Sequence, residues 1–414
     1  MQPTRSEPRT DVLSVEEIRA AFPALERCEN GLPVAYFDGP GGTQVPRAVV
    51  GAVADYLLHH NANTHWAYPT SAETDEALAG ARQAFADFLD ARPDEIAFGA
   101  NMTTLTFHVA RALGRGWRSG DEIVVTDLDH QANIAPWHDV ARERDLVVRT
   151  VPLIPDSGIL DWDAFASLVT ERTRLVAIGG ASNAIGTIND LPRAVELAHG
   201  VGALAFVDGV HLAAHAKVDV AALGCDLYTC SPYKFYGPHL GVLAARRDLL
   251  EMLDVPRLPP ASNEPPERLE TGTLCHEGIV GAGAAVDYLA SLAPGADRPA
   301  RLRDAFAAMH RRSEKLFARA WEGLAALPGV RLFGPPPGAP RSPTLAFTVE
   351  GRTTKEVTRR LAERAVFVSH GDFYAPNVVA GLGLAPDGLV RAGCAIYTTA
   401  EEIDRLVDGV GASS

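Results

Sequence analysis

Short apolar runs that end in polar or glycine residues recur through the first two thirds of the chain. Continuous apolar runs of this length are typical of parallel strands that are buried on both faces of a sheet. Segments with helical periodicity separate these runs. The predicted strands lie within Gly120–Thr126, Leu175–Gly179, Ala203–Asp208 and Leu240–Ala245, and the predicted helices cover Val45–Leu58, Thr74–Leu89, Leu105–Leu113 and Ile279–Leu292. The pattern predicts an α/β domain.

The last third of the chain has a different order of elements. Proline and glycine within Pro294–Pro299 mark a break, after which Arg301–Leu327 has the periodicity of one long helix. Strands and helices then follow in the order β-β-α-β-β-α, which predicts a smaller α+β domain. These elements are Val330–Phe333, Thr344–Val349, Thr354–Arg364, Phe367–Ser369, Leu389–Cys394 and a last helix that begins within Thr399–Glu402.

A polar tail, residues 1 to about 12, precedes a short predicted helix near the N-terminus. Ser14 and Glu17 have the spacing of a capping box, so the helix begins there and ends near Phe22. We therefore predict an N-terminal arm that joins the small domain (residues 1–35), a large domain (residues 36–295) and a small C-terminal domain (residues 296–414).

Composition narrows the class of protein. The net charge of −14 argues against a nucleic-acid-binding protein, which would carry basic patches. No run of 18 apolar residues predicts a membrane span, and Met1–Asp11 lacks the apolar core of a signal peptide. The five cysteines have neither paired nor metal-like spacing. These features predict a cytoplasmic protein without a membrane partner.

The segment Thr229–Pro238 holds a lysine between two turns. A Ser-Pro turn precedes Lys234 and a Tyr-Gly-Pro turn follows it, so proline and glycine fix the backbone on both sides. A desolvated lysine loses its proton and attacks an aldehyde to give a Schiff base. Asp208 ends an apolar run, where ligands of open α/β sheets bind. Together the two residues indicate pyridoxal 5'-phosphate (PLP), whose ring nitrogen needs an anionic partner.

Three other segments have candidate chemistry. The small-residue turn Phe98–Thr104 opens a helix, so its free N–H groups would bind a phosphate, although a threonine N-cap without a ligand is the alternative. The glycine-rich segment Asp38–Gln44 lacks the lysine and spacing of a nucleotide loop, which favours a tight turn. The histidines of His59–His65 lack companion ligands, and so does the pair His211 and His215, so no metal is predicted.

From about Tyr36 onward, the chain resembles class V aminotransferase-type PLP enzymes of fold type I, and among them the cysteine desulfurase and selenocysteine lyase group. The segment Asp129–Trp137 is similar to Glu-His-His-Ala-Asn-Ile-Val-Pro-Trp of relatives. The resemblance implies a mostly parallel seven-stranded sheet in the large domain. It also implies that Lys234 forms the Schiff base, and that the glycine-rich segment Asp38–Gln44 lies at the mouth of the active site.

The same resemblance implies the contacts of the cofactor ring. His130 would stack on the ring and move protons, and Asp208 would pair with its nitrogen. Asn183 would lie near the phenolic oxygen and the substrate carboxylate. His211 stands where desulfurases carry glutamine, so its ring N–H would make that contact with the phenolic oxygen.

Phosphate contacts are implied for the turn at Met102 and Thr103, and for Ser231 and Tyr233. Relatives have two threonines in that turn, so Met102 removes one hydroxyl and the backbone donors must contribute more. Tyr233 replaces a histidine, and its hydroxyl would reach the phosphate.

The resemblance also implies how substrate and a second subunit are bound. Arg391 would hold the substrate carboxylate, because a planar guanidinium suits bidentate binding, and His65 would lie beside the substrate. Thr273 would reach the phosphate of the neighbouring subunit, which implies a homodimer with shared active sites.

One feature of desulfurases is missing. They carry a thiol on a mobile loop of the small domain, and the corresponding stretch His370–Pro376 has no cysteine. Proton removal from the α-carbon by Lys234 remains available to PLP chemistry. We therefore predict a lyase that acts on a small, cysteine-like amino acid by β-elimination at a C–S bond, instead of persulfide transfer. The alternatives are a class V aminotransferase, an amino-acid epimerase, or a non-catalytic homologue that keeps the fold.

Overall fold

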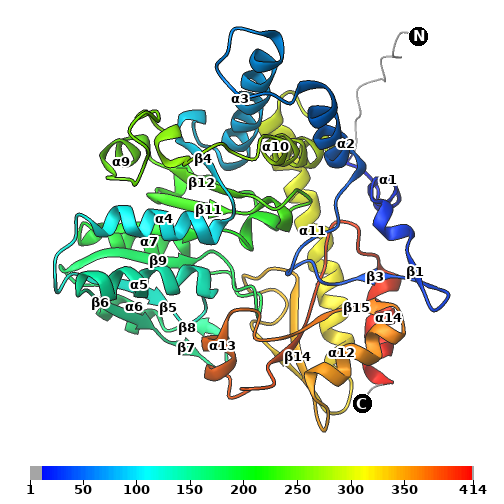
Figure 1. Ribbon diagram of the computed structural model, residues 1–414. Coiled ribbons are helices and arrows are strands. Elements are labelled where there is room, and N and C mark those ends of the chain that lie inside the picture. Colours follow the sequence, from blue (N-terminus) through cyan, green and yellow to red (C-terminus); the bar gives the residue numbers. More distant parts are fainter. Residues whose placement is uncertain (1–11, 413–414) are drawn as a thin grey trace, which may run out of the picture.

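A seven-stranded sheet forms the centre of the computed structural model, which describes residues 12–412 (Figure 1). Its strand order is β4-β12-β11-β10-β9-β5-β6. All strands are parallel except β12, which runs antiparallel to both of its neighbours. The strands are β4 (Ile96–Gly99), β5 (Glu122–Thr126), β6 (Val147–Val151), β9 (Thr173–Gly179), β10 (Leu204–Asp208), β11 (Leu227–Cys230) and β12 (Gly241–Ala245). The predicted mostly parallel sheet is confirmed.

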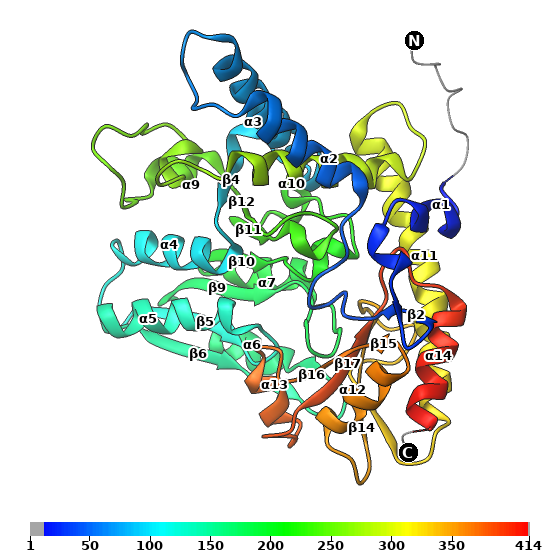
Figure 2. The ribbon, with the colours of Figure 1, turned by 45° about the vertical axis from the view of Figure 1, so that its right-hand side comes forward.

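Helices cover both faces of this sheet, and successive strand residues alternate between two apolar cores (Figures 1 and 2). Ile123 and Val125 pack with α4 and α5, whereas Val124 belongs to the core that includes α3, α7 and α10. Burial on both faces explains the continuous apolar runs in the sequence. The helices are α2 (Arg47–Asp55), α3 (Pro69–Leu89), α4 (Met102–Gly114), α5 (Ala135–Arg144), α6 (Trp162–Leu168), α7 (Leu191–Gly200), α8 (Val220–Leu223), α9 (Arg247–Met252) and α10 (His276–Ser291).

The C-terminal part has its own antiparallel sheet, in the order β13-β14-β17-β16. Phe347 and Val390 pack on helices of this part, whereas Ala346 and Leu389 join a core of the large sheet. The sheet is therefore buried on both sides. Its elements are α11 (Arg298–Ala325), β13 (Val330–Phe333), β14 (Thr344–Val349), α12 (Thr354–Glu363), β16 (Ser369–Gly371), α13 (Pro376–Gly381), β17 (Leu389–Gly393) and α14 (Ala400–Gly411).

Three details of the predicted elements are wrong. The single predicted strand Phe367–Ser369 is divided: β15 (Val366–Phe367) pairs with β3 (Ala35–Tyr36), and β16 pairs with β17. The short helix α13 lies between β16 and β17, where no helix was expected. The helix predicted to end at Leu58 changes at Asp55 into a π-helical turn, Tyr56–His60, as local insertions in a helix do.

The N-terminal arm packs where the two parts of the molecule meet. Helix α1 (Val15–Ala20) begins with the predicted capping box, in which Ser14 Oγ accepts from Glu17 N at 3.2 Å. Strand β3 pairs with β15 in a separate two-stranded sheet, which ties the end of the arm to the C-terminal part. The predicted tail lies outside the described residues except at Val12, and the boundaries at residues 35 and 295 stay predictions. Within residues 12–412, no helix is both long enough and apolar enough to span a bilayer.

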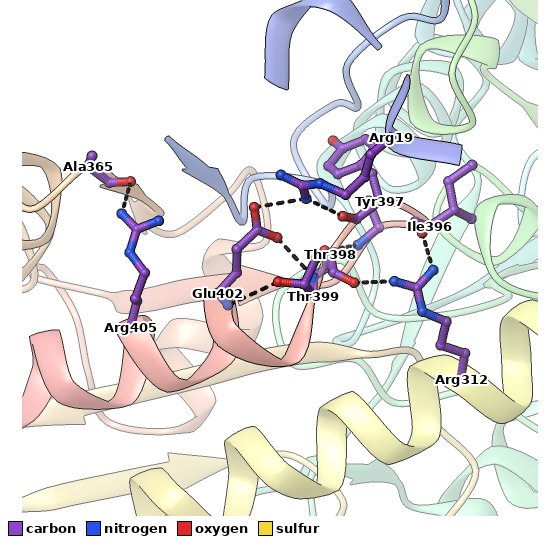
Figure 3. Close-up of polar contacts among 10 residues, drawn as sticks. Arg19, Arg312, Ala365, Ile396, Tyr397, Thr398, Thr399, Glu402 and Arg405 are labelled. Carbon is purple, nitrogen blue, oxygen red and sulfur yellow. Dashed lines mark hydrogen bonds and ion pairs between the residues drawn. The ribbon is translucent and has the colours of Figure 1, made fainter. Parts of the chain in front are cut away.

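Two arginines hold the loop that connects β17 to α14 (Figure 3). Arg312 of α11 donates to the carbonyl oxygens of Ile396 and Thr398. Arg19 of α1 donates to the carbonyl oxygen of Tyr397 and pairs with Glu402 at 3.0 Å. Because these carbonyls are buried or half-buried in the junction, charged donors stabilise them more than neutral donors would.

We predict that Arg312→Met destabilises the fold, because methionine keeps the apolar stem but leaves two carbonyls without donors. Urea unfolding is expected to show a loss of about 2–3 kcal/mol. Arg319→Met on the same helix is the matched control. Arg319 pairs with Asp404 on the surface, so its loss is expected to cost below about 1 kcal/mol. Equal losses for the two variants would contradict the importance of the Arg312 contacts.

Candidate active site

A cleft at the carboxyl ends of β5, β9, β10 and β11 brings together most of the residues predicted from the sequence. The carboxyl ends of parallel strands meet at one edge of a sheet, and ligands bind there in open α/β folds. The cleft has a volume of about 80 Å³ and opens beside a larger cavity of about 590 Å³. Among its lining residues are Met102, Thr103, His130, Asn183, Asp208, His211, Ser231, Tyr233 and Lys234.

Lys234 lies at the end of a 3-10 turn, Pro232–Lys234, and only 7% of it is exposed. Its Nζ donates to the carbonyl oxygen of Pro40. Burial and, to a smaller extent, the charge of Arg391 lower the pKa of Lys234 to about 7, although the carboxylates of Asp38 and Asp208 oppose the shift. A large fraction of the amine is therefore unprotonated at neutral pH, as attack on an aldehyde requires.

Asp208 is the last residue of β10, and its Oδ1 accepts from Val210 N at 2.9 Å. Burial raises the pKa of Asp208 to about 6, although the Val210 N–H and the nearby Lys234 oppose the rise. A cationic ring nitrogen bound at this carboxylate would favour its ionised form. The arrangement therefore suits a protonated pyridine nitrogen.

Asp129 is a second buried carboxyl group of the cleft, and sequence reasoning gave it no role. It accepts from Gly179 N at 2.5 Å and from Asn133 Nδ2 at 3.1 Å. Burial and the charge of Asp208 hold the pKa of Asp129 well above its usual range. A Cβ at Gly179 would lie 2.3 Å from Asp129 Oδ1, so this glycine is required for the close approach.

His130 follows β5, and its Nδ1 accepts from Ala132 N at 3.0 Å. The proton of the neutral ring is therefore on Nε2. Burial and, to a smaller extent, the charges of Lys234 and Arg391 lower the pKa of His130 to about 4. The imidazole is neutral near pH 7, which suits stacking on a cofactor ring. The predicted transfer of protons through His130 stays a prediction.

Two buried polar atoms of the cleft have no hydrogen-bond partner among the described residues, namely Asn183 Oδ1 and His211 Nδ1. His211 Nε2 lies 3.0 Å from the hydroxyl oxygens of Ser342 and Thr344, which come from the small sheet and the segment before it. Unpaired buried polar atoms are costly and indicate a missing partner. His211 was predicted beside the phenolic oxygen of PLP, and a neutral ring that donates from Nδ1 fits that oxygen. Asn183 Oδ1 can only accept, and the Nδ2 of Asn183 donates to the Phe373 carbonyl at 2.9 Å.

The turn that opens α4 also lines this cleft, through Asn101, Met102 and Thr103. Asn101 caps α4 by accepting from Thr104 N at 2.8 Å, which leaves the earlier amides of Met102 and Thr103 without helical acceptors. The side chain of Met102 is buried in an apolar core, so only its backbone N–H can serve an anion. These donors and the helix N-terminus suit a phosphate.

Ser231 and Tyr233 complete this part of the cleft. Ser231 is buried and lines the cleft, and its contact with a phosphate stays a prediction. Tyr233 lines both cavities, and its ring stacks on His239 with centroids 4.9 Å apart. The contact with His239 was not expected, and it restricts the orientation of the Tyr233 ring. Contact of the Tyr233 hydroxyl with a phosphate stays a prediction.

Arg391, in β17, is buried beside Asn183 and is already engaged by protein groups. Its Nη1 donates to Asn183 O at 3.0 Å, its Nε to Ser369 Oγ at 3.3 Å, and its Nη2 pairs with Asp38 Oδ1 at 3.4 Å. Burial lowers the pKa of Arg391 to about 10, so it stays charged at neutral pH. Asp38 is about half exposed, so a substrate carboxylate would compete with Asp38 for the guanidinium.

The structure does not bring His65 and Thr273 to the Lys234 cleft within one chain. Both line a different surface cavity of about 800 Å³, together with Trp66. The lining of that cavity shares no residue with the two cavities at Lys234. A role for either residue at an active site therefore requires a second copy of the chain.

Sequence reasoning missed several residues that contact the site. Asp38 and Pro40 belong to the glycine-rich segment Asp38–Gln44, which forms a tight turn. The segment also contacts Lys234 and Arg391. It is therefore both a tight turn and a loop beside the cleft, the two alternatives that the sequence left open. The segment Asp38–Gln44 has neither a charge pattern nor a sequence motif that would predict the contact between Asp38 and Arg391. Phe373 and Tyr374 close over the cleft, and only their position in the loop without cysteine drew notice to them.

Comparisons with known proteins agree with this geometry. Residues 35–406 match the aminotransferase class-V family. The chain is 34% identical to a cysteine desulfurase of Dickeya dadantii over 412 residues, with 96% of each chain covered, and 35% identical to one of Salmonella agona, with 96% of this chain and 97% of that protein covered.

Solved structures give the same result. The apo structure of a cysteine desulfurase from Thermococcus onnurineus has a TM-score of 0.88 at 27% identity and covers 98% of this chain and 99% of its own. The cysteine desulfurase CsdA from Escherichia coli has a TM-score of 0.84 at 29% identity, with 97% and 98% covered.

The chain belongs to the aminotransferase class-V family. It is a PLP-dependent enzyme of the cysteine desulfurase-like kind, with the fold of fold-type-I PLP enzymes. The predicted cofactor and fold class are thus confirmed. When bound, PLP accepts the electron pair that remains at the α-carbon after a bond to it breaks. The residues that would hold PLP are those of the cleft around Lys234.

We predict that PLP uptake by the apo protein accelerates as pH rises through about 7, because only the unprotonated amine of Lys234 attacks the aldehyde. An ordinary lysine would show this rise near pH 10.4. The rate is measured by the absorbance of protein-bound cofactor after mixing. A rise centred above pH 9 would contradict the buried, depressed state of Lys234.

We predict that Asp208→Asn lowers kcat by about 10²–10³-fold, because an amide does not keep the ring nitrogen protonated. Bound PLP, measured after release in alkali, is expected to remain. Asp129→Asn is the matched control, because Asp129 is a buried carboxyl group of the same cleft whose oxygens already accept from Gly179 N and Asn133 Nδ2. Equal losses in the two variants would contradict a specific role of Asp208.

Proposed function

We propose that this enzyme is a C–S lyase that cleaves a small, cysteine-like amino acid by β-elimination. The observation that carries the proposal is the absence of any cysteine from the residues that line the two cavities at Lys234 within residues 12–412. Without a thiol, sulfur leaves as a free thiol or sulfide and is not handed to the protein as a persulfide.

The positions of the five cysteines support this proposal. Cys225, Cys230 and Cys394 are buried, and burial raises the pKa of each thiol, for Cys225 and Cys394 to about 12. Cys28 and Cys275 are exposed but line neither cavity at Lys234. Desolvation also raises the pKa of Cys275, so it is a weak nucleophile.

The residues of the cleft supply the steps that such a reaction needs. Arg391 and the amide of Asn183 bind the substrate carboxylate. Lys234, with its near-neutral pKa, removes the α-proton and returns a proton to the departing sulfur. Asp208 keeps the ring nitrogen protonated, and the neutral His130 covers the ring face.

We also propose a homodimer with shared active sites in the cytoplasm. His65 and Thr273 line a surface cavity away from Lys234, which a second copy would turn into part of its own site. Trp66 in the same cavity is 62% exposed, and exposed aromatic side chains mark interaction surfaces. The five free cysteines fit a reducing compartment.

We predict that purified enzyme releases a thiol or sulfide, ammonia and an oxo acid in equal amounts from a cysteine-like substrate, without an added amino acceptor. The Cys28→Ser, Cys275→Ser double variant is expected to keep its rate within about twofold, because neither thiol contacts the site. Product amounts are measured by thiol titration and enzymatic assay of the oxo acid.

Other outcomes identify other functions. Accumulation of pyridoxamine phosphate would indicate an aminotransferase, and a change in substrate chirality without thiol release would indicate an epimerase. No spectral change of bound PLP with any amino acid would indicate a non-catalytic homologue. Loss of activity in the double cysteine variant would indicate that the enzyme transfers sulfur as a persulfide.

A further inference from the structure

The loop that replaces a thiol-bearing loop is built as an aromatic cover over the cleft. Phe373 and Tyr374 are consecutive non-glycine residues with φ of 57° and 58°. This left-handed conformation is unfavourable for bulky side chains, so surrounding contacts must hold it. The Phe373 carbonyl accepts from Asn183 Nδ2 at 2.9 Å, and the Tyr374 carbonyl accepts from Gln131 N at 2.7 Å.

The two aromatic rings cover groups that serve the reaction. The Phe373 ring lies 4.0 Å from the guanidinium carbon of Arg391. The Tyr374 ring lies 5.4 Å from the ring of His130. Because the carbonyl of each residue is bonded to the cleft, the backbone of this segment cannot leave without breaking contacts of Asn183 and Gln131. The strained backbone therefore sets the position of two rings at the substrate position.

The cavity beneath this loop suits an uncharged, apolar side chain. Its volume of about 590 Å³ is within the range of small-molecule sites. Four aromatic residues, Phe107, Tyr233, Phe373 and Tyr374, supply half of its large side chains, and no Asp or Glu of residues 12–412 lines it. Lys234 is one of its two cations.

Arg391 is the other cation of that lining. Lys234 is assigned to the cofactor and Arg391 to the substrate carboxylate, so neither is left to pair with a substrate side chain. A charged substrate side chain would therefore lose its hydration and gain no counter-ion from the lining. The thiol of free cysteine, with one sulfur atom, would leave most of the aromatic surface without contact.

We propose that the substrate is an S-substituted L-cysteine whose substituent is uncharged and apolar or aromatic, and that Phe373 and Tyr374 determine this preference. The inference rests on the C–S lyase function proposed above. In the reaction the α-proton goes to Lys234, the Cβ–S bond breaks, and the electron pair leaves with sulfur, which takes up a proton. Water then completes the release of pyruvate and ammonia, so each substrate and one water give one thiol, one pyruvate and one ammonium.

The test compares four compounds with the PLP-loaded enzyme: S-benzyl-, S-methyl- and S-carboxymethyl-L-cysteine, and L-cysteine. Thiol or sulfide and pyruvate are measured together. The value of kcat/KM is expected to be at least about tenfold higher for the benzyl compound than for each of the others. Phe373→Ala and Tyr374→Ala are expected to lower the benzyl-to-methyl ratio by about fivefold or more.

Met252→Ala is the matched control, because Met252 is 72% exposed, as Tyr374 is at 73%, but lies outside the cavity. It is expected to leave the ratio unchanged. A ratio of two substrates on one variant cancels a general loss of folded enzyme. Binding of 3-(benzylthio)propanoate, which has the carboxylate and the ring but no amine, gives a readout without turnover. Calorimetry is expected to show weaker binding to both aromatic variants.

The outcomes separate this inference from the function on which it rests. If thiol and pyruvate form at equal kcat/KM from the benzyl and methyl compounds, or the carboxymethyl compound is preferred, the lyase function stands and this inference is overturned. An unchanged ratio in both aromatic variants overturns it as well. If none of the four compounds releases a thiol or sulfide, the proposed function fails and the inference fails with it.

Discussion

The burial of one amine beside a neutral acceptor is the constraint on which the site depends. Lys234 donates to the Pro40 carbonyl, and no carboxylate within residues 12–412 is in ion-pair contact with its Nζ. Desolvation therefore decides its charge, and an amine that would be protonated in water is reactive near neutrality. The large sheet supplies the burial, because the turn that carries Lys234 follows a central strand and lies under the glycine-rich segment Asp38–Gln44.

The sequence predicted the parts of the site that a single local pattern determines. Asp208, Asn183 and His130 each follow an apolar run, and parallel strands bring such positions to one edge. The turn before α4 was predicted because a helix start exposes amides whatever its tertiary surroundings. The family resemblance, and not the local pattern, supplied the roles of Asn183, His130, His211, Ser231 and Tyr233. Nine of the ten expected cofactor residues line one cleft.

The parts that were missed depend on contacts between distant segments. The strand expected at Phe367–Ser369 is divided because its two halves pair with different partners, one of them 331 residues away at Tyr36. The left-handed backbone of Phe373 and Tyr374 has no local sequence signal, since neither residue favours it. Asp38 reaches Arg391 across 353 residues. No residue spacing encodes such pairs, because tertiary packing alone brings them together.

Asn183 connects the large sheet to the C-terminal part through both its backbone and its side chain. Its backbone oxygen accepts from Arg391 of the small sheet, and its side-chain amide donates to Phe373, also of the small domain. Because Arg391 is also the residue expected to bind a carboxylate, ligand binding and the stability of this junction are linked free energies. By reciprocity, a ligand that strengthens the junction is bound less tightly, by the same factor, when the junction is weakened. The affinity for a carboxylate is consequently a property of the contact between the two sheets as well as of the cleft.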